Sequence, residues 1–187
     1  KAVDKAAEPT PEAQKSAQVE TQHKQTFTGE RAAIVKYLEE LFVDSRNVNK
    51  EGEKRRARAK LEEAMDWDHV ARLCLGPKQA KAQAGKNIDQ FAKLLKEVVI
   101  KTAYSRLDKF WTDETVYTFQ TITINKNEAR VPTRFLVNGE PFMMEYFMEK
   151  KAGKWIIYDI AYEDMRYGLN INEQITAFLK ENNFQTL

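Results

Sequence analysis

The chain has 187 residues, of which 42% are hydrophobic and 31% charged, and this composition is typical of a folded globular protein. Thirty Lys and Arg stand against 28 Asp and Glu, so a net charge of +2 provides no chain-wide basic field for nucleic acid. A single cysteine, Cys74, excludes an internal disulfide, and no apolar run approaches the ~18 residues of a membrane-spanning helix.

The first 28 residues have the composition of a flexible tail or linker. They contain two prolines, four lysines balanced by four acidic residues, and only three sizeable apolar side chains. Such a segment buries too little apolar surface to offset the entropy lost on ordering. The chain also begins at Lys1 without an initiator Met or an apolar leader, as expected for a processed or trimmed chain. We therefore predict a tail over 1–28 and a single domain over 29–187.

Helical periodicity dominates up to about residue 109. Apolar residues recur every three to four positions after Thr28, in a short helix capped by Asp66, and in a long helix over 87–109. A very basic helix with a thin apolar stripe precedes Asp66. Gly76-Pro77 is expected to end the short helix, because Gly accepts left-handed geometry and Pro cannot continue a helix. A last amphipathic helix is predicted over 171–182.

The period changes to that of β-strands after Trp111. Asn138-Gly139 is the strongest hairpin signal, and a two-residue turn there places Phe135 opposite Phe142 and Val131 opposite Tyr146. The predicted strands cover 114–124, 129–137, 142–149 and 154–162.

The predicted elements are helices, then an antiparallel meander, then a final helix. This order indicates an α+β fold. We expect a helical N-terminal half packed on a curved four-stranded antiparallel sheet, a closing C-terminal helix, and an apolar cavity between sheet and helices. The hairpin register turns one apolar, Met-rich face toward the helices and a second face, with Arg130, Glu145 and Phe147, partly toward solvent. The periodic spacing of the apolar residues does not show whether they fill a solid core or line a cavity that holds a lipid tail. The candidate lipid-binding residues are Leu38, Leu41, Leu95, Val98, Val131, Phe135, Phe142, Met144, Tyr146, Met148 and Ile157.

Catalytic and metal-binding arrangements are poorly supported. His69 and Cys74 are best explained as structural residues, Asp66 as a helix cap, and no Cys/His spacing suits zinc. The chain has no phosphate-binding loop and no dinucleotide glycine pattern. Asp159 falls on the Met144 side of the sheet if Ala152-Gly153 is a regular two-residue turn, and a bulge would turn it outward. We expect no metal and no cofactor.

The segment 46–60 carries seven basic and two acidic residues, a local charge of +5. The simplest interpretation is a solvated helix face. The functional alternatives are contact with an anionic lipid surface or with an acidic partner. Nucleic acid is the weakest candidate because no aromatic residues are interleaved with the charges. The candidate residues for partner or headgroup contact are Arg55, Arg56 and Arg58.

An ordered set of motifs over about 32–187 resembles the MlaC family, also called the toluene-tolerance auxiliary family. The first motif is the segment 65–76, MDWDHVARLCLG, in which Asp residues flank a Trp before a terminal Leu-Gly. The second is the apolar stripe of the long helix, and the third is the segment 155–160, WIIYDI. Asp164-Met165-Arg166 departs from the family pattern, so the chain resembles a divergent member. The other matching positions are Phe91, Leu94, Leu95, Tyr104, Leu107, Glu163, Asn170, Gln174, Phe178 and Leu179.

The resemblance implies a non-enzymatic carrier of phospholipid or a related lipid. Its implied partners are an inner-membrane ABC transporter complex and an outer-membrane lipid complex, with transient membrane contact. It further implies a periplasmic location after removal of a signal peptide. We expect a monomer that does not bind nucleic acid. The open alternative is a small-molecule enzyme or ligand-binding domain on a curved sheet like that of ketosteroid isomerase.

Overall fold

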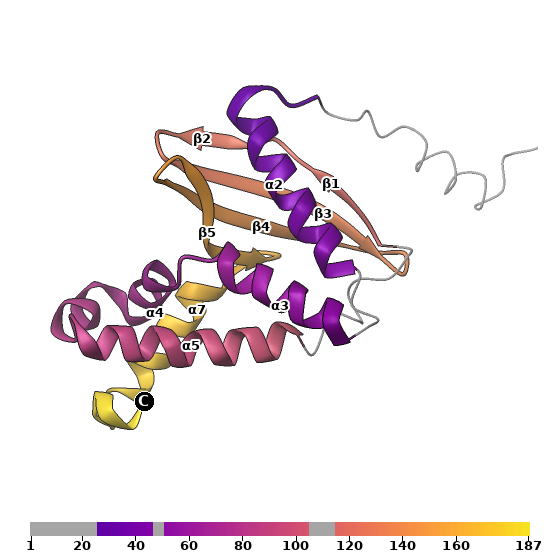
Figure 1. Cartoon of the computed structure of the whole chain (residues 1–187). Coiled ribbons are helices and arrows are strands. Elements are labelled where there is room, and N and C mark those ends of the chain that lie inside the picture. The colour runs from indigo at the N-terminus through magenta and orange to yellow at the C-terminus, as the bar shows by residue number, and fades with distance from the viewer. Residues whose placement is uncertain (1–25, 47–50, 105–114) are drawn as a thin grey trace, which may run out of the picture.

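The computed structural model describes residues 26–46, 51–104 and 115–187, so most of the predicted tail and the last residues of the predicted long helix lie outside the described residues. Within these ranges the elements follow the predicted order (Figure 1). No helix in these ranges is both long and apolar enough to cross a bilayer. The helices are α2 (Gly29–Arg46), α3 (Glu51–Ala64), α4 (Trp67–Ala82), α5 (Lys86–Tyr104) and α7 (Tyr167–Phe178), with a 3₁₀ turn at Phe184–Thr186. The strands are β1 (Val116–Phe119), β2 (Thr123–Asn125), β3 (Glu128–Val137), β4 (Glu140–Lys151), β5 (Lys154–Tyr162) and β6 (Met165–Arg166).

The antiparallel sheet has the strand order β1-β3-β4-β5-β6, and β2 also pairs with β3. The prediction of four strands is therefore corrected, because the first strand is split into β1 and β2 and the short β6 is added. The pairing register with β3 changes by one residue between β1 and β2. Pro132 lies at this point of β3 and has no backbone N–H for the ladder. Its carbonyl still accepts the Gln120 N–H at 2.8 Å, which keeps the two segments on one edge.

The β3–β4 hairpin forms as predicted. Asn138 and Gly139 have φ angles of 51° and 83°, the positive values that a type I′ turn requires. The strands pair in the predicted register, from Val137 opposite Glu140 to Val131 opposite Tyr146. The predicted apolar set therefore shares one face of the sheet.

Helix α2 lies diagonally across that apolar face of the sheet (Figure 1). Its stripe of Ile34, Leu38, Leu41 and Phe42 is buried against the sheet because these positions recur at the helical period. We call the resulting group of buried residues the inner cluster. Its members are Ile34, Leu38, Leu41, Phe42, Ala64, Phe119, Ile122, Ala129, Val131, Phe135, Tyr146, Met148, Trp155 and Ile157.

The long helix α5 does not face the sheet, which corrects the expectation for its apolar stripe. It lies beside α3 and α4, away from the sheet (Figure 1). Ile88 of α5 joins a second cluster with residues of α4 and α7, and Phe91 and Leu95 pack against it. Periodicity predicted that α5 has an apolar side, but it does not specify which surface that side meets.

Gly76 interrupts α4 where the sequence predicts that the helix ends. Its backbone is left-handed, with a φ of 71°, and helical geometry then resumes at Pro77. The break leaves carbonyl groups near it without their helical partners. The Asn172 side chain of α7 donates a hydrogen bond to one of these, the Cys74 carbonyl oxygen, at 2.9 Å. The Cys74 side chain is fully buried, and burial raises the pKa of its thiol to about 12, so the thiol stays protonated.

Gly168, at the start of α7, sits where no side chain fits. A Cβ there would lie 2.4 Å from Leu73 Cδ2 and 3.1 Å from Asp159 Oδ1. Gly168→Ala is therefore expected to lower the free energy of unfolding by about 1–3 kcal/mol through overpacking. Urea unfolding measures this loss. Gly52→Ala in α3 is the matched control, since nothing lies within 4 Å of its Cβ and Ala favours a helix. Equal effects of the two substitutions would contradict the prediction.

Candidate functional site

The candidate site is the region between α2 and the apolar face of the sheet, which buried side chains occupy. Seven of the eleven predicted lipid-binding residues belong to the inner cluster, and two more, Phe142 and Met144, pack against it. Leu95 packs instead against the α4–α5–α7 cluster, and Val98 is 63% exposed on α5. The seven are Leu38, Leu41, Val131, Phe135, Tyr146, Met148 and Ile157.

Phe42 fills the centre of this space and was not among the predicted lining residues. Its ring centroid lies 5.0 Å from that of Tyr117, 5.6 Å from Phe135 and 5.7 Å from Tyr146. These aromatic contacts hold the second half of α2 on the sheet. The sequence signal was present, since Phe42 continues the stripe of the first helix, but it did not indicate that this side chain occupies the centre.

A pocket of about 580 Å³ opens onto the inner cluster between α2, α3 and the β4–β5 hairpin. This volume lies within the range of small-molecule pockets. Leu41, Ala64 and Trp155 belong both to its lining and to the inner cluster, so part of the pocket wall is the edge of the apolar interior. Charged residues from all three elements also line it, including Lys60 and Lys154. Its mixed lining suits an amphiphilic molecule.

The first turn of α2 is attached to the sheet by polar contacts. Glu30 accepts hydrogen bonds from Lys150 Nζ at 2.6 Å and from Trp155 Nε1 at 2.9 Å, and both bonds lower the pKa of Glu30. Arg31 Nε donates to the Ile122 carbonyl at 3.0 Å. Polar groups therefore fix the start of α2, whereas Leu38, Leu41 and Phe42 contribute apolar contacts further along.

Asp66 caps α4 as predicted, accepting the His69 N–H at 3.1 Å. His69 Nδ1 lies 2.8 Å from Glu149 Oε1, and Lys151 Nζ pairs with both Glu149 and Asp66. Burial alone would raise the pKa of Asp66, but the bonds from Lys151 and His69 outweigh it and lower that pKa.

Asp66, His69 and Glu149 also offer ligand atoms within 4.8 Å of one another, which is close enough to surround a metal ion. The Lys151 ammonium already neutralises two of these three groups. The arrangement is therefore best described as an ion-pair network that joins α4 to β4.

Asp159 points away from the inner cluster, to the outer face of the sheet. A β-bulge between β4 and β5 shifts the register so that Asp159 lies opposite Phe147. The Ala152-Gly153 turn is regular, with Lys151 opposite Lys154, so the bulge rather than the turn decides which face Asp159 takes. This corrects the placement that a regular ladder would give.

The Asp159 carboxylate is 3% exposed and fully engaged. It accepts hydrogen bonds from Arg166 Nε at 2.8 Å and from the backbone N–H of Gly168 and Ile160 at 2.9 Å each. These bonds connect β5 to the start of α7, so Asp159 has a structural role in the described residues.

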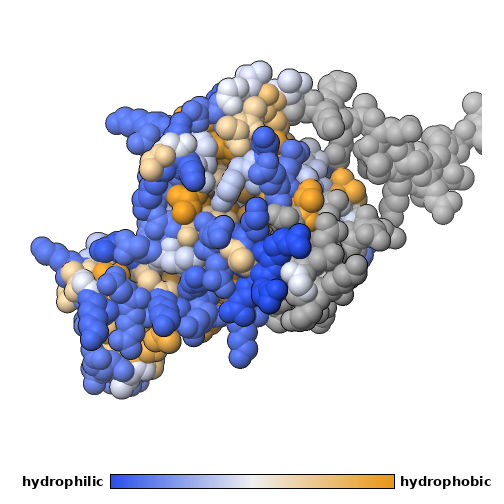
Figure 2. Space-filling view, viewed as in Figure 1, coloured by the Kyte–Doolittle hydropathy of each residue, from blue (hydrophilic) through white to orange (hydrophobic). Residues whose placement is uncertain are grey.

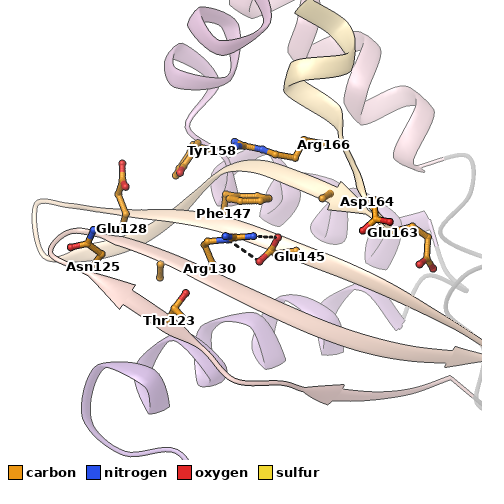
Figure 3. Close-up of a pocket in the computed structure, with 12 residues that line it drawn as sticks. Thr123, Asn125, Glu128, Arg130, Glu145, Phe147, Tyr158, Glu163, Asp164 and Arg166 are labelled. Carbon is orange, nitrogen blue, oxygen red and sulfur yellow. Dashed lines mark hydrogen bonds and ion pairs between the residues drawn. The ribbon is translucent and has the colours of Figure 1, made fainter.

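A second pocket, of about 470 Å³, lies on the outer face of the sheet (Figure 3). The Phe147 ring lies between two guanidinium groups, with Arg166 at 4.0 Å and Arg130 at 5.3 Å from its centroid. Arg130 forms a bidentate pair with Glu145, and Arg166 pairs with Asp159. This polar face confirms the prediction of a partly solvated outer face, and both arginines already have carboxylate partners.

The exposed basic residues described in α3 form what we call the basic patch, in a hydrophilic area of the surface (Figure 2). They are Arg55, Arg56, Arg58 and Lys60. Arg55, Arg56 and Arg58 are all exposed, as expected for a solvated helix face. Arg58 Nε pairs with Glu62 at 3.0 Å, whereas no ion pair of Arg55 or Arg56 occurs among the described residues. Arg56 and Lys60 are four positions apart and therefore share a side of α3, and Lys60 lines the pocket that opens onto the inner cluster.

The fold and the site define an α+β domain in which a helix covers the apolar face of a curved antiparallel sheet, with a pocket beside the helix. The model of the family described as MlaC protein matches residues 35–187. The chain therefore belongs to the MlaC protein family, as its motifs predict. No curated protein sequence matches the chain.

Among solved structures, the chain is similar to the phospholipid-binding protein from Ralstonia solanacearum, determined in complex with a phospholipid. The TM-score is 0.70 at 14% identity, over 82% of this chain and 89% of that chain. This similarity confirms the α+β fold. An NTF2-like transpeptidase from Campylobacter jejuni shares 12% identity, with a TM-score of 0.41, over 70% of this chain and 97% of that chain. That TM-score is too low to indicate a shared fold.

Proposed function

We propose that the protein is a non-enzymatic lipid carrier of the periplasm, which binds phospholipid or a related lipid beneath α2. It passes this lipid between an inner-membrane ABC transporter complex and the outer membrane. The observation that carries the proposal is the inner cluster, where nine predicted lipid-binding residues lie in or against one apolar group next to an open pocket. Membership of the MlaC family and the phospholipid bound to the Ralstonia solanacearum protein support the same function.

The physical requirement is enclosure of acyl chains, since exposing them to water costs about 0.8 kcal/mol per CH₂. In the conformation described here, Phe42 and Leu38 occupy the space that a chain would take. Lipid binding therefore requires the second half of α2 to move away from the sheet, while the Glu30 contacts hold its first turn. In this motion the sheet loses its contacts with apolar side chains of α2 and gains contacts with the acyl chain, which is also apolar.

Mass spectrometry of organic extracts from the purified full chain tests the proposal directly. We expect phospholipid at a stoichiometry near one per protein molecule, and uptake of phospholipid from vesicles by delipidated protein. Repeated absence of lipid under both conditions would overturn the carrier function. The enzymatic alternative requires a carboxylate or imidazole facing the inner cluster, and Asp159, which a regular ladder would place there, faces the opposite side of the sheet.

The basic patch on α3 supports a transient contact with anionic membrane surfaces during lipid uptake. The double variant Arg55→Glu and Arg56→Glu is expected to weaken association with phosphatidylglycerol vesicles about tenfold or more at low salt, because each surface cation contributes about 1 kcal/mol. Vesicle co-sedimentation measures the effect. The matched control is Lys78→Glu with Lys81→Glu on α4, two exposed lysines outside this patch. Equal losses in both double variants would show that net charge alone matters.

A further inference from the structure

Tyr146 places a hydroxyl group in the middle of the apolar inner cluster. Its side chain is almost completely enclosed, with 5% of the residue exposed. Across the sheet it lies opposite Val131 on β3 and Ile160 on β5, and the Phe42 ring of α2 is 5.7 Å from its ring. The Tyr146 side chain therefore lies where α2 meets the sheet.

This hydroxyl lacks a good acceptor among the described residues. Its one hydrogen bond there runs to Met144 Sδ at 3.9 Å, and a thioether sulfur is a weak acceptor. Buried polar side-chain atoms are normally satisfied, and an exception in a native protein calls for an explanation. The buried Thr133 on the same face, by contrast, donates to the Val131 carbonyl oxygen at 3.4 Å.

The Tyr146 hydroxyl is a proton donor at any physiological pH. Burial raises the pKa of Tyr146 well above its ordinary value, so the group stays neutral. A neutral donor surrounded by apolar side chains is suited to a neutral acceptor, because a charged phosphate placed there would be strongly disfavoured. The neutral acceptors attached directly to the acyl chains of a diacyl phospholipid are its ester carbonyl oxygens.

We propose that the Tyr146 hydroxyl donates a hydrogen bond to an ester carbonyl of the bound lipid, so that the site favours ester-linked over ether-linked phospholipids. This inference rests on the proposed lipid-carrier function. When the lipid replaces Phe42, one acyl chain lies against Tyr146, and the hydroxyl exchanges Met144 Sδ for a carbonyl oxygen. Tyr146 then acts as a specificity-determining residue, since an ether lipid of the same length has no carbonyl oxygen at that position of the chain.

The test compares uptake of two phosphatidylglycerols with equal chain length, one diacyl and one dialkyl, offered together in equimolar vesicles to the delipidated full chain. Mass spectrometry of the extracted protein gives the ratio of the two lipids bound. We expect the wild type to favour the diacyl lipid about three- to tenfold, the effect of one hydrogen bond. Tyr146→Phe is expected to bind both lipids equally, with its loss of affinity confined to the diacyl lipid. Tyr162→Phe, which changes a half-exposed tyrosine on the same face, should keep the wild-type ratio.

Three outcomes would overturn the inference: no linkage preference in the wild type, a preference that survives in Tyr146→Phe, or an equal loss of both lipids in that variant. Urea unfolding of the lipid-free proteins gives an independent check. Tyr146→Phe should be at least as stable as the wild type, because it removes a poorly satisfied hydroxyl. A clear loss of stability would show that the hydroxyl has a good partner inside the protein, and would also overturn the inference. Failure of the wild type to take up either lipid would instead overturn the carrier function itself.

Discussion

Phe42→Ala is expected to lower the free energy of unfolding of the lipid-free protein by about 3–5 kcal/mol. The Phe42 side chain is almost fully buried and lies against rings on β1, β3 and β4, so its removal leaves a cavity beneath α2. Urea unfolding of delipidated protein measures the loss. Val43→Ala is the matched control, because the next residue of the same helix is 53% exposed and should change stability by less than about 0.5 kcal/mol.

The same substitution is expected to have the opposite effect on lipid uptake. With no ring to displace, Phe42→Ala should take up phospholipid from vesicles faster than the wild type, and bound lipid should restore more stability to the variant than to the wild type. Transfer of a fluorescent phospholipid and unfolding with saturating lipid measure both effects. A destabilised variant with unchanged or slower uptake would show that Phe42 belongs to a permanent core and does not occupy the lipid position.

Asp159→Ala is expected to lower the free energy of unfolding by about 3 kcal/mol. The substitution removes the acceptor for the buried Gly168 N–H and leaves Arg166 without its carboxylate partner. A buried donor left without an acceptor costs about 1–3 kcal/mol, and the partly exposed Arg166 guanidinium also loses its charge partner. Urea unfolding measures the loss, and Asp159→Asn should lose less, since the amide oxygen still accepts a hydrogen bond.

The control for Asp159 is Asp164→Ala, which removes an exposed carboxylate five residues away and should leave stability within about 0.5 kcal/mol. Phospholipid bound per folded molecule should be unchanged in all three variants, because Asp159 lies on the outer face of the sheet. A specific loss of lipid in a stable Asp159→Asn variant would contradict a purely structural role.

The sequence predicted most of the sheet, because local rules determine a hairpin. Asn138-Gly139 requires positive φ at both residues, and this turn alone fixed which side chains share a face with Tyr146. The Asp66 cap and the break at Gly76 were predictable for the same reason, since each depends on one side chain and its own backbone.

The partner of each helix was not predictable in this way. The apolar stripe of α5 is more pronounced than that of α2, yet α2 covers the sheet and Val98 of α5 remains exposed. The choice depends on the tertiary arrangement of several helices, which a periodic pattern does not contain. The bulge that turns Asp159 outward is a similar case, because one extra residue in a strand has no distinct sequence signal.

The candidate site was predicted as a list of apolar residues but not as an arrangement. Whether Tyr146 faces a partner, a ring or open space depends on where Phe42 and Met144 place their side chains. The pocket beside α3 depends likewise on three segments that are distant in sequence. These side-chain contacts require the three-dimensional structure, because residue polarity and the spacing of apolar residues do not specify which side chains are neighbours.

The two kinds of contact along α2 have a thermodynamic consequence for a carrier. In the proposed loading motion, the Glu30 and Arg31 bonds would persist while Leu38 and Phe42 leave the sheet, so loading would be an exchange between two apolar occupants of one volume. The buried apolar area changes little in such an exchange, and the free-energy difference between loaded and empty protein is correspondingly small. A carrier that works in this way would release its cargo to an acceptor that offers a comparable apolar environment, without consuming ATP itself.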